Sequence, residues 1–386
     1  MNAGSPTPNQ ARAADLAPGS LGWRLCVART AHEFFKIPQD PAILSAIGKT
    51  ADADTTEPLS VADFSKYLDT QGLPAAGNVT DLTGITGAME RAGHLLPFGA
   101  PLNLPFMGQR YVTQGGAWGH QIGGNLWLSE VFGAELIIPS YSYVTVQICG
   151  KDAKGEPRWG TGLAVNGTHV ITNKHVVANL DPTTQVEIHP PQGGSEANRV
   201  DCQSPVHLHP ELDIAVIEAA LPEGKSLRQL PGLAFRNPSW VDDVYLFGYP
   251  HIPMTTEMAI TVQRGQVVNP AAESPAGAGR PRQKIFLYSA IARPGNSGGP
   301  IVAQDGRVIG LVVEDSSPTT SGRAFDHEDA QDCSIEGQIQ QLVGEVGELK
   351  AKTAAAPFYR GIPASEIVRA LDDLGLSGLI ELDQPR

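Results

Sequence analysis

The chain has 386 residues, of which 41% are hydrophobic and 18% are charged, a composition typical of a globular protein with a proper core. Its formal net charge of −13 argues against broad binding to nucleic acids or anionic membranes, because both require basic surface. No segment has the roughly 18 consecutive apolar residues of a membrane span, and the first residues lack the pattern of a signal peptide. These absences predict a cytoplasmic protein.

The cysteines and histidines indicate neither disulfides nor a metal site. The chain has four widely spaced cysteines that form no CxxC pair: Cys26, Cys149, Cys202 and Cys333. In a chain of this length, such spacing favours reduced, buried thiols over a disulfide framework. His207 and His209 in "HLHP" are not accompanied by further residues in the pattern of a metal site. We expect both on the surface or in a loop. The sequence therefore predicts no metal and no cofactor.

The N-terminal third of the chain favours helices. Residues 1–20 are expected to be disordered, and residues 21–135 are expected to form an α-rich region for interactions. The stretch "SVADFSKYLDTQG" begins with an S-x-x-D cap at Ser60, and "TDLTGITGAMERAG" is helical from Thr80 to Gly93. The residues that follow favour β-strands and could form a hairpin. Helices followed by a hairpin resemble a winged-helix module. The alternative is an α-rich extension that packs on the main domain.

From Leu136 the sequence changes to short β-branched or aromatic runs that are separated by turn residues. Examples are "LIIPSYSYVTVQICG", "GTGLAVNGTHVITNKHVV", "DIAVIEA" and "RVIGLVVED". Closely spaced strands without intervening helices predict an all-β sandwich or barrel over residues 136–386.

Ser297 lies between glycines in "LYSAIARPGNSGGPIVAQDGRVIG" and is a candidate nucleophile. The "GNSGG" pattern also fits the nucleophile elbow of α/β-hydrolases, but that motif requires a helix directly after the serine and the order Ser, acid, His. Here Pro300 follows, and "PIVAQDGRVIGLVV" predicts a β-hairpin that turns at "DG". The esterase interpretation fails on this context, whereas the order His175, Asp213, Ser297 fits a serine-protease triad.

The surroundings of the three residues support that order. His175 stands at the end of "HVITNKHVV", and Asp213 opens the apolar run "DIAVIEA". Together with "LFGYP" and "ARPGNSGGPIV", these motifs resemble the trypsin/chymotrypsin-like serine proteases, and within them the HtrA/Deg-like branch. The resemblance covers roughly residues 138–375. It implies a mainly β fold, a double six-stranded antiparallel β-barrel, and serine endopeptidase activity on protein substrates.

Each residue type suits the chemistry that the resemblance implies. The Ser297 hydroxyl needs a base, which His175 supplies, and Asp213 orients the imidazole and stabilises its charged form. Gly295 lets the chain turn so that its N–H and that of Ser297 point at one spot and form the oxyanion hole. Asn296 replaces the aspartate with which trypsin-like zymogens capture a newly cleaved N-terminus. We therefore expect that N-terminal processing does not activate the enzyme.

The resemblance also predicts the primary specificity pocket. The family places its base six residues before the serine, at Ile291, with Ala292 beside it and Val313 on a wall. None of these residues is acidic. Cleavage is therefore expected after small or medium apolar residues rather than after Lys or Arg.

The sequence departs from the family between "GLVVED" and the closing "FYRGIPASEIVRALDDLG". A helical insertion is predicted at about 316–356, because apolar residues recur there at helical spacing. It is expected either to lie on the barrel or to act as a docking or gating helix. No PDZ module is seen after the barrel, so control by a regulatory protein partner is expected to act through residues 21–135 or the insertion.

Two functions compete at this level. The first is an intracellular endopeptidase that cuts a protein substrate, for example a co-encoded protein. The second is a regulatory or DNA-binding protein whose protease domain cleaves only itself. Residues 1–138 hold 8 Lys/Arg and 12 Asp/Glu, whereas a DNA-reading winged helix usually has a basic face. Protein contact, rather than nucleic-acid binding, is therefore predicted for the N-terminal region.

Overall fold

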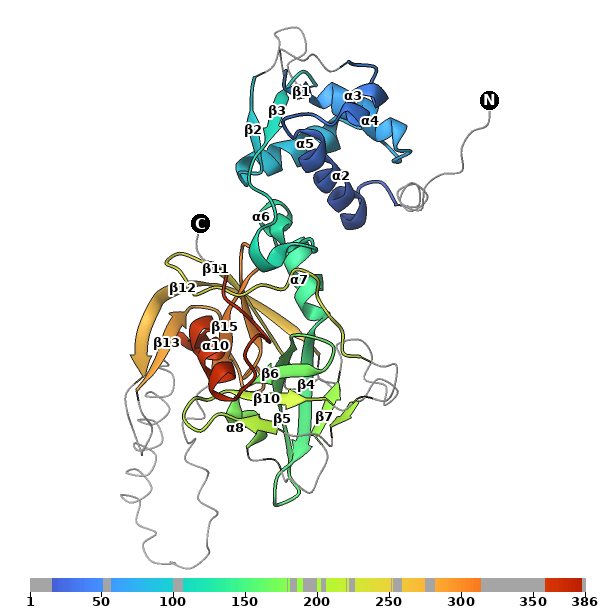
Figure 1. Cartoon of the computed structure of the whole chain (residues 1–386). Coiled ribbons are helices and arrows are strands. Elements are labelled where there is room, and N and C mark those ends of the chain that lie inside the picture. The colour runs from blue at the N-terminus through green and yellow to red at the C-terminus, as the bar shows by residue number, and fades with distance from the viewer. Residues whose placement is uncertain are drawn as a thin grey trace, which may run out of the picture.

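The computed structural model of the chain describes residues 16–50, 57–99, 107–178, 180, 186–189, 200–202, 206–219, 221, 226–250, 252, 259–274, 282–313 and 358–383. Figure 1 shows a helical N-terminal region and a larger β-rich body, with helices α6 and α7 between them. The predicted insertion at about 316–356 lies outside the described residues.

The N-terminal region consists of helices and one small sheet. In chain order its elements are α2 (Leu21–Phe34), α3 (Pro41–Ala46), β1 (Leu59–Ser60), α4 (Val61–Thr70), α5 (Val79–Arg91), β2 (Leu95–Pro97) and β3 (Arg110–Thr113). The strands pair antiparallel in the order β1-β3-β2. Helices α4 and α5 thus precede the antiparallel pair of β2 and β3, and β1 lies at the edge of that pair. The winged-helix interpretation stays a prediction.

The helix starts follow from local side-chain chemistry. Ser60 caps α4 with its hydroxyl, and the Asp63 carboxylate accepts a hydrogen bond from the Ser60 N–H, so the predicted capping box is present. The Asn78 side chain caps α5, which begins at Val79, one position before the predicted start at Thr80. The buried faces of these helices, with Trp23, form a core of their own.

The segment between the two bodies differs from the prediction. Residues from Leu136 read as a β-branched run, but they form helix α7 (Ala134–Ser142), which contains Pro139. The reason is that Gly133 turns the chain with a φ of 55° and its carbonyl accepts the N–H groups of Leu136 and Ile137. Short apolar runs do not distinguish a buried helix from a strand by periodicity alone. The predicted boundary after residue 135 falls inside this helix.

The connecting segment contributes side chains to both cores. It contains η1 (Gly119–Gln121), η2 (Leu126–Leu128), α6 (Ser129–Phe132) and α7. Leu126 and Tyr141 belong to the barrel core, whereas Trp127 and Leu128 belong to the N-terminal core. Consecutive residues buried in two different cores hold the two bodies together more firmly than an exposed linker would.

The β-rich body contains two antiparallel sheets. The first has seven strands in the order β8-β7-β4-β5-β6-β10-β9 and, over the described residues, is open. Its strands are β4 (Thr145–Lys151), β5 (Pro157–Ala164), β6 (His169–Thr172), β7 (Val186–His189), β8 (Val200–Cys202), β9 (Val206–Leu208) and β10 (Ala215–Glu218). One-turn helix α8 (Lys174–Val177) follows β6.

The second sheet is a closed six-stranded barrel in the order β11-β12-β13-β16-β15-β14. Its strands are β11 (Asp243–Gly248), β12 (Thr261–Ser274), β13 (Gln283–Tyr288), β14 (Pro300–Ala303), β15 (Val308–Val313) and β16 (Tyr359–Pro363), and helix α10 (Ala364–Asp373) follows. The predicted hairpin after Ser297 is β14–β15. The fold class is confirmed as mainly β, with two barrel-like sheets and helices in the N-terminal region.

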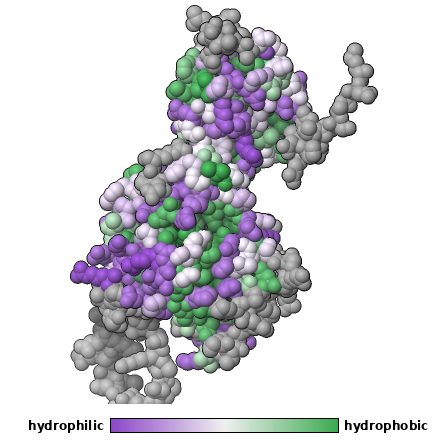
Figure 2. Space-filling model, in the orientation of Figure 1, coloured by the Kyte–Doolittle hydropathy of each residue, from purple (hydrophilic) through white to green (hydrophobic). Residues whose placement is uncertain are grey.

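The surface adds little to this picture. On the face shown in Figure 2, hydrophobic residues gather over the barrels. Within the described residues, no helix is both long and apolar enough to cross a bilayer.

Candidate active site

Strand pairing brings His175 and Asp213 together. β6 and β10 are antiparallel and Thr172 is paired with Ala215, so the chain leaving β6 meets the chain entering β10. The His175 Nδ1 lies 2.6 Å from one carboxylate oxygen of Asp213, and the His175 backbone N–H donates to the other oxygen at 2.9 Å. Asn173 Nδ2 also donates to the Asp213 carbonyl at 3.0 Å. The carboxylate thus fixes both the ring and the backbone of His175.

Ser297 lies in the loop between β13 and β14, and it is 5% exposed. Its carbonyl accepts a hydrogen bond from the Thr161 N–H of the first sheet at 2.9 Å. The next residue, Gly298, has a φ of +83°, and a Cβ there would lie 2.2 Å from Thr172 Oγ1 and 3.0 Å from the Asn173 nitrogen. The serine loop therefore packs directly on the end of β6, two residues before His175.

Gly295 occupies a similarly tight place on the other side of the serine. Its φ is +98°, and an added Cβ would lie 2.4 Å from the Tyr249 carbonyl and 3.0 Å from Trp159 Nε1. The Thr161 hydroxyl donates to the Gly295 carbonyl at 2.7 Å and accepts the Tyr249 N–H at 2.9 Å. Because only glycine tolerates this backbone and this packing, both glycines around the serine have a steric role.

Asn296, in the loop that carries Ser297, is buried, with 1% of its surface exposed. Its Oδ1 has no hydrogen-bond partner within the described part of the chain, and a Cβ on Gly248 would lie 2.8 Å from that oxygen. A neutral amide at this position needs no counter-ion, whereas a carboxylate here would need one.

The residues predicted for the specificity pocket lie on two elements. Ile291 is 47% exposed in the loop after β13, and its neighbour Ala292 is buried. Val313 ends β15 and is partly buried. Their role in substrate choice stays a prediction.

His209 was expected on the surface or in a loop, and it does lie in a loop, but its side chain is buried. It follows β9 and is 3% exposed, and its ring contacts groups on both sides. No local signal marks these contacts, because the side chains that commonly bind the backbone ahead in a turn are those of Asn, Asp, Ser and Thr rather than His. His209 lies four residues before Asp213, so the contacts of its ring are made within the loop that carries this carboxylate.

The structure describes the side chains of two of the four cysteines. Cys26 and Cys149 are free thiols. Burial raises the pKa of Cys149 to about 11, and the neighbouring Glu187 adds to the effect. A thiol with so high a pKa is a poor nucleophile at neutral pH.

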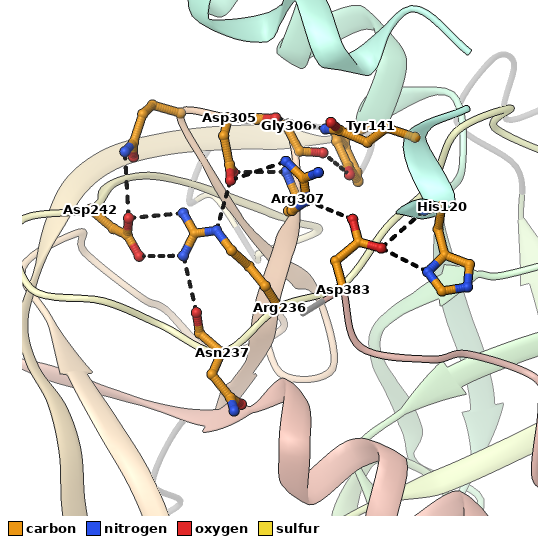
Figure 3. Close-up of polar contacts among 11 residues, drawn as sticks. His120, Tyr141, Arg236, Asn237, Asp242, Asp305, Gly306, Arg307 and Asp383 are labelled. Atoms are coloured by element: carbon orange, nitrogen blue, oxygen red, sulfur yellow. Dashed lines mark hydrogen bonds and ion pairs between the residues drawn. The ribbon is translucent and has the colours of Figure 1, made fainter. Parts of the chain in front are cut away.

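A network of charged residues joins the connecting segment to the second barrel and to the C-terminal segment (Figure 3). The Asp383 carboxylate accepts from Arg307 Nε at 2.8 Å and from the backbone N–H of His120 at 2.9 Å. The Tyr141 hydroxyl donates to the Gly306 carbonyl at 2.7 Å. These contacts meet at the β14–β15 turn, and β14 begins three residues after Ser297.

A second part of the network supports the same turn. Arg236 makes a two-pronged ion pair with Asp242 at 2.8 and 2.9 Å and also donates to Asp305 at 2.7 Å. Burial lowers the pKa of Arg236, but the hydrogen bonds and charges of the two aspartates outweigh it and raise the pKa above its ordinary value. The guanidinium therefore stays charged between the two carboxylates.

Comparison with known proteins finds similarity within the β-rich body. Residues 160–311 match the family model of the trypsin-like peptidase domain. The chain therefore contains a trypsin-like peptidase domain, which agrees with the closed barrel and the barrel-like first sheet. Its curated relatives are Do-like proteases, and it thus resembles the Deg/HtrA-like branch of that class.

The relatives are distant and longer. The chloroplastic Do-like protease 1 of Arabidopsis thaliana is 25% identical over 218 residues, which are 56% of this chain and 44% of that protein. The mitochondrial Do-like protease 3 of the same plant is 30% identical over 158 residues, which are 40% of this chain and 25% of that protein. The chain thus spans less than half the length of these two relatives.

Solved structures give the same impression of distant similarity. The active form of the Rv3671c protease from M. tuberculosis is 19% identical, with a TM-score of 0.42, over 65% of this chain and 86% of that one. The HtrA-type protease AlgW with a tripeptide is 22% identical, with a TM-score of 0.35, over 46% of this chain and 52% of that one.

Proposed function

We propose that the chain is a serine endopeptidase that hydrolyses peptide bonds of a protein substrate through His175, Asp213 and Ser297. The observation that carries the proposal is the double contact of Asp213 with His175, made where the serine loop packs on the end of β6. A carboxylate that holds an imidazole by Nδ1 leaves Nε2 to act as a base.

The reaction follows from these roles. His175 Nε2 takes the proton of the Ser297 hydroxyl while the oxygen attacks the scissile carbonyl. The tetrahedral oxyanion is stabilised by the backbone N–H groups of Gly295 and Ser297. The imidazolium, stabilised by Asp213, then returns its proton to the leaving amine, and water hydrolyses the acyl-enzyme by the same steps.

The primary specificity pocket takes small or medium apolar side chains. Support comes from the residue types at Ile291, Ala292 and Val313, which offer no charge to a Lys or Arg side chain. Peptide libraries that vary the residue before the scissile bond test this preference.

Control of the enzyme resides in the N-terminal region or in a protein that binds it, in an intracellular setting. Two observations support this part of the proposal. The buried Asn296 lacks the charge with which a zymogen aspartate binds a new N-terminus. The connecting segment is bound to the β14–β15 turn through Tyr141 and to the C-terminal segment through His120.

The alternative of a DNA-binding protein that only cleaves itself is less well supported. Helix α5, which precedes the hairpin, has Asp81 in its first turn. Its one basic residue is Arg91, the last residue of the helix. A recognition helix for DNA needs positive charge near the phosphates.

One proteomic experiment tests the proposal. N-termini are compared after incubation of candidate substrates, co-encoded proteins included, with the wild type and with Ser297→Ala. The proposal predicts new N-termini that appear in trans only with the wild type. Identical N-termini with both proteins would refute it, and cleavage confined to the chain itself would favour the alternative.

A further inference from the structure

The loop that delivers Asp213 to the site, residues 209–213, begins at a buried histidine. His209 Nδ1 accepts the backbone N–H of Leu212 at 2.8 Å and that of Glu211 at 3.1 Å. A ring nitrogen that accepts two N–H groups carries no proton, so the proton of the neutral ring is on Nε2. That Nε2 donates to the Asp373 carboxylate, 3.1 Å away at the end of α10.

The backbone of His209 is bound as firmly as its ring. Its N–H donates to the Ile214 carbonyl at 3.1 Å, which closes the loop on the far side of Asp213. Its carbonyl accepts the Lys174 ammonium at 2.8 Å, and Lys174 directly precedes His175 in the chain. Within the described part of the chain, His209 therefore touches the start of the loop, the end of the loop and the helix that bears His175.

From this geometry we infer that His209 is a positioning residue, which sets the Asp213 carboxylate against His175 by capping the loop that carries it. The inference rests on the proposed function for its effect on turnover, but not for its effect on the His175–Asp213 hydrogen bond. Without the two bonds to Nδ1, the N–H groups of Glu211 and Leu212 are unpaired and the loop loses its fixed shape.

The size of the effect follows from the tolerance of the site. The contact between His175 Nδ1 and Asp213 is 2.6 Å long, and a misplacement of about 1 Å in a catalytic group costs about 100-fold in rate. His209 touches no reacting atom, so substrate binding should change little. The loss is therefore expected in kcat rather than in KM.

The variants separate the two ring nitrogens. His209→Ala removes both contacts. His209→Asn keeps an oxygen near the position of Nδ1, because an Asn side chain binds the backbone N–H two residues ahead in the same kind of turn, but it loses the link to Asp373. His207→Ala is the matched control, since His207 lies two residues earlier on β9 and its Nε2 is 3.8 Å from the Glu218 carboxylate, outside the loop.

Two measurements are made on full-length protein: kcat and KM for a peptide substrate, and the low-field proton NMR resonance of the His175 Nδ1–H. We expect His209→Ala to lose about 10- to 100-fold in kcat and to broaden or shift the resonance. We expect His209→Asn to recover most of both, and His207→Ala to match the wild type.

Two results would overturn the inference. One is a folded His209→Ala protein with wild-type kcat and an unchanged resonance. The other, which decides the matter if His209→Ala does not fold, is a folded His209→Asn protein whose kcat and resonance are lost. If the wild type itself shows no turnover, the proposed function fails, but the resonance still tests the placement of Asp213 by His209.

Discussion

The hydroxyl of Thr161 donates a 2.7 Å hydrogen bond to the carbonyl of Gly295 and thereby ties the first sheet to the loop that carries Ser297. The same hydroxyl accepts the N–H of Tyr249, and the Thr161 carbonyl accepts the hydroxyl of Thr172. One side chain thus joins β5, the segment after β11 and the serine loop.

Replacing this side chain should weaken both the fold and the site. Thr161→Val keeps the shape but leaves the buried Tyr249 N–H and the partly buried Gly295 carbonyl without their partner, at a cost of about 2–4 kcal/mol. Urea unfolding measures the loss, and kcat should fall with it. Thr83→Val is the control, since the Thr83 hydroxyl makes an exposed hydrogen bond to a carbonyl of its own helix; equal losses for the two variants would contradict the role of Thr161.

The glycine after the serine should not tolerate a side chain. Gly298→Ala combines a φ of +83° with a Cβ placed 2.2 Å from the Thr161 carbonyl, and we expect a loss of about 3 kcal/mol or more. Gly375→Ala isolates the cost of the backbone, because Gly375 has a φ of +75° and open space around its Cβ position. That variant should lose only about 1 kcal/mol. The two are compared by thermal and urea unfolding.

Asn296→Asp tests the idea that this site needs a neutral residue. A buried carboxylate without a partner should cost about 3–5 kcal/mol at neutral pH. Because burial raises the pKa of such a carboxyl, its charged form is the costly one, so the deficit should shrink as the pH falls. Asn166→Asp is the control, since the Asn166 oxygen already accepts backbone N–H groups from Thr168 and His169. A stable, fully active Asn296→Asp protein would contradict the account.

The Arg307–Asp383 pair should contribute strongly to stability above acid pH. Burial raises the pKa of Asp383, but the hydrogen bonds from the His120 backbone and from Arg307 outweigh it, so the pKa lies below its ordinary value of 3.8. A carboxyl with a lowered folded pKa stabilises above its ordinary pKa and loses that contribution as the pH falls through the folded value. Asp383→Asn should therefore lose about 3 kcal/mol at pH 7, and the difference from the wild type should narrow below about pH 4.

A neighbouring carboxylate provides the control for that variant. Glu381 lies 3.3 Å from His120 Nε2 but is largely exposed, so Glu381→Gln should change stability by less than about 1 kcal/mol. Equal unfolding curves for Asp383→Asn and the wild type across this pH range would show that the buried pair is not a stabilising contact.

Local patterns in the sequence predicted much of this structure. The cap at Ser60 and the hairpin after Ser297 rest on contacts between residues close in the chain. The alignment of His175 with Asp213 was open to prediction because both positions stand beside strongly apolar strands.

Other features depend on partners far away in the chain, and the sequence did not indicate them. The sequence of helix α7 resembles that of a strand because its apolar residues are buried in two different cores. The Arg307–Asp383 pair spans 76 residues. His209 reaches Asp373 over 164 residues, so its burial could not be predicted from "HLHP" alone.

The identity of the nucleophile is tested most directly with a fluorophosphonate probe, which reacts covalently with an activated serine hydroxyl. After labelling of the full-length protein, peptide mass spectrometry should place the probe on Ser297. Labelling should be absent in Ser297→Ala and slower by about 1,000-fold or more in His175→Ala. A label on another residue, or full hydrolytic activity in Ser297→Ala, would contradict the account.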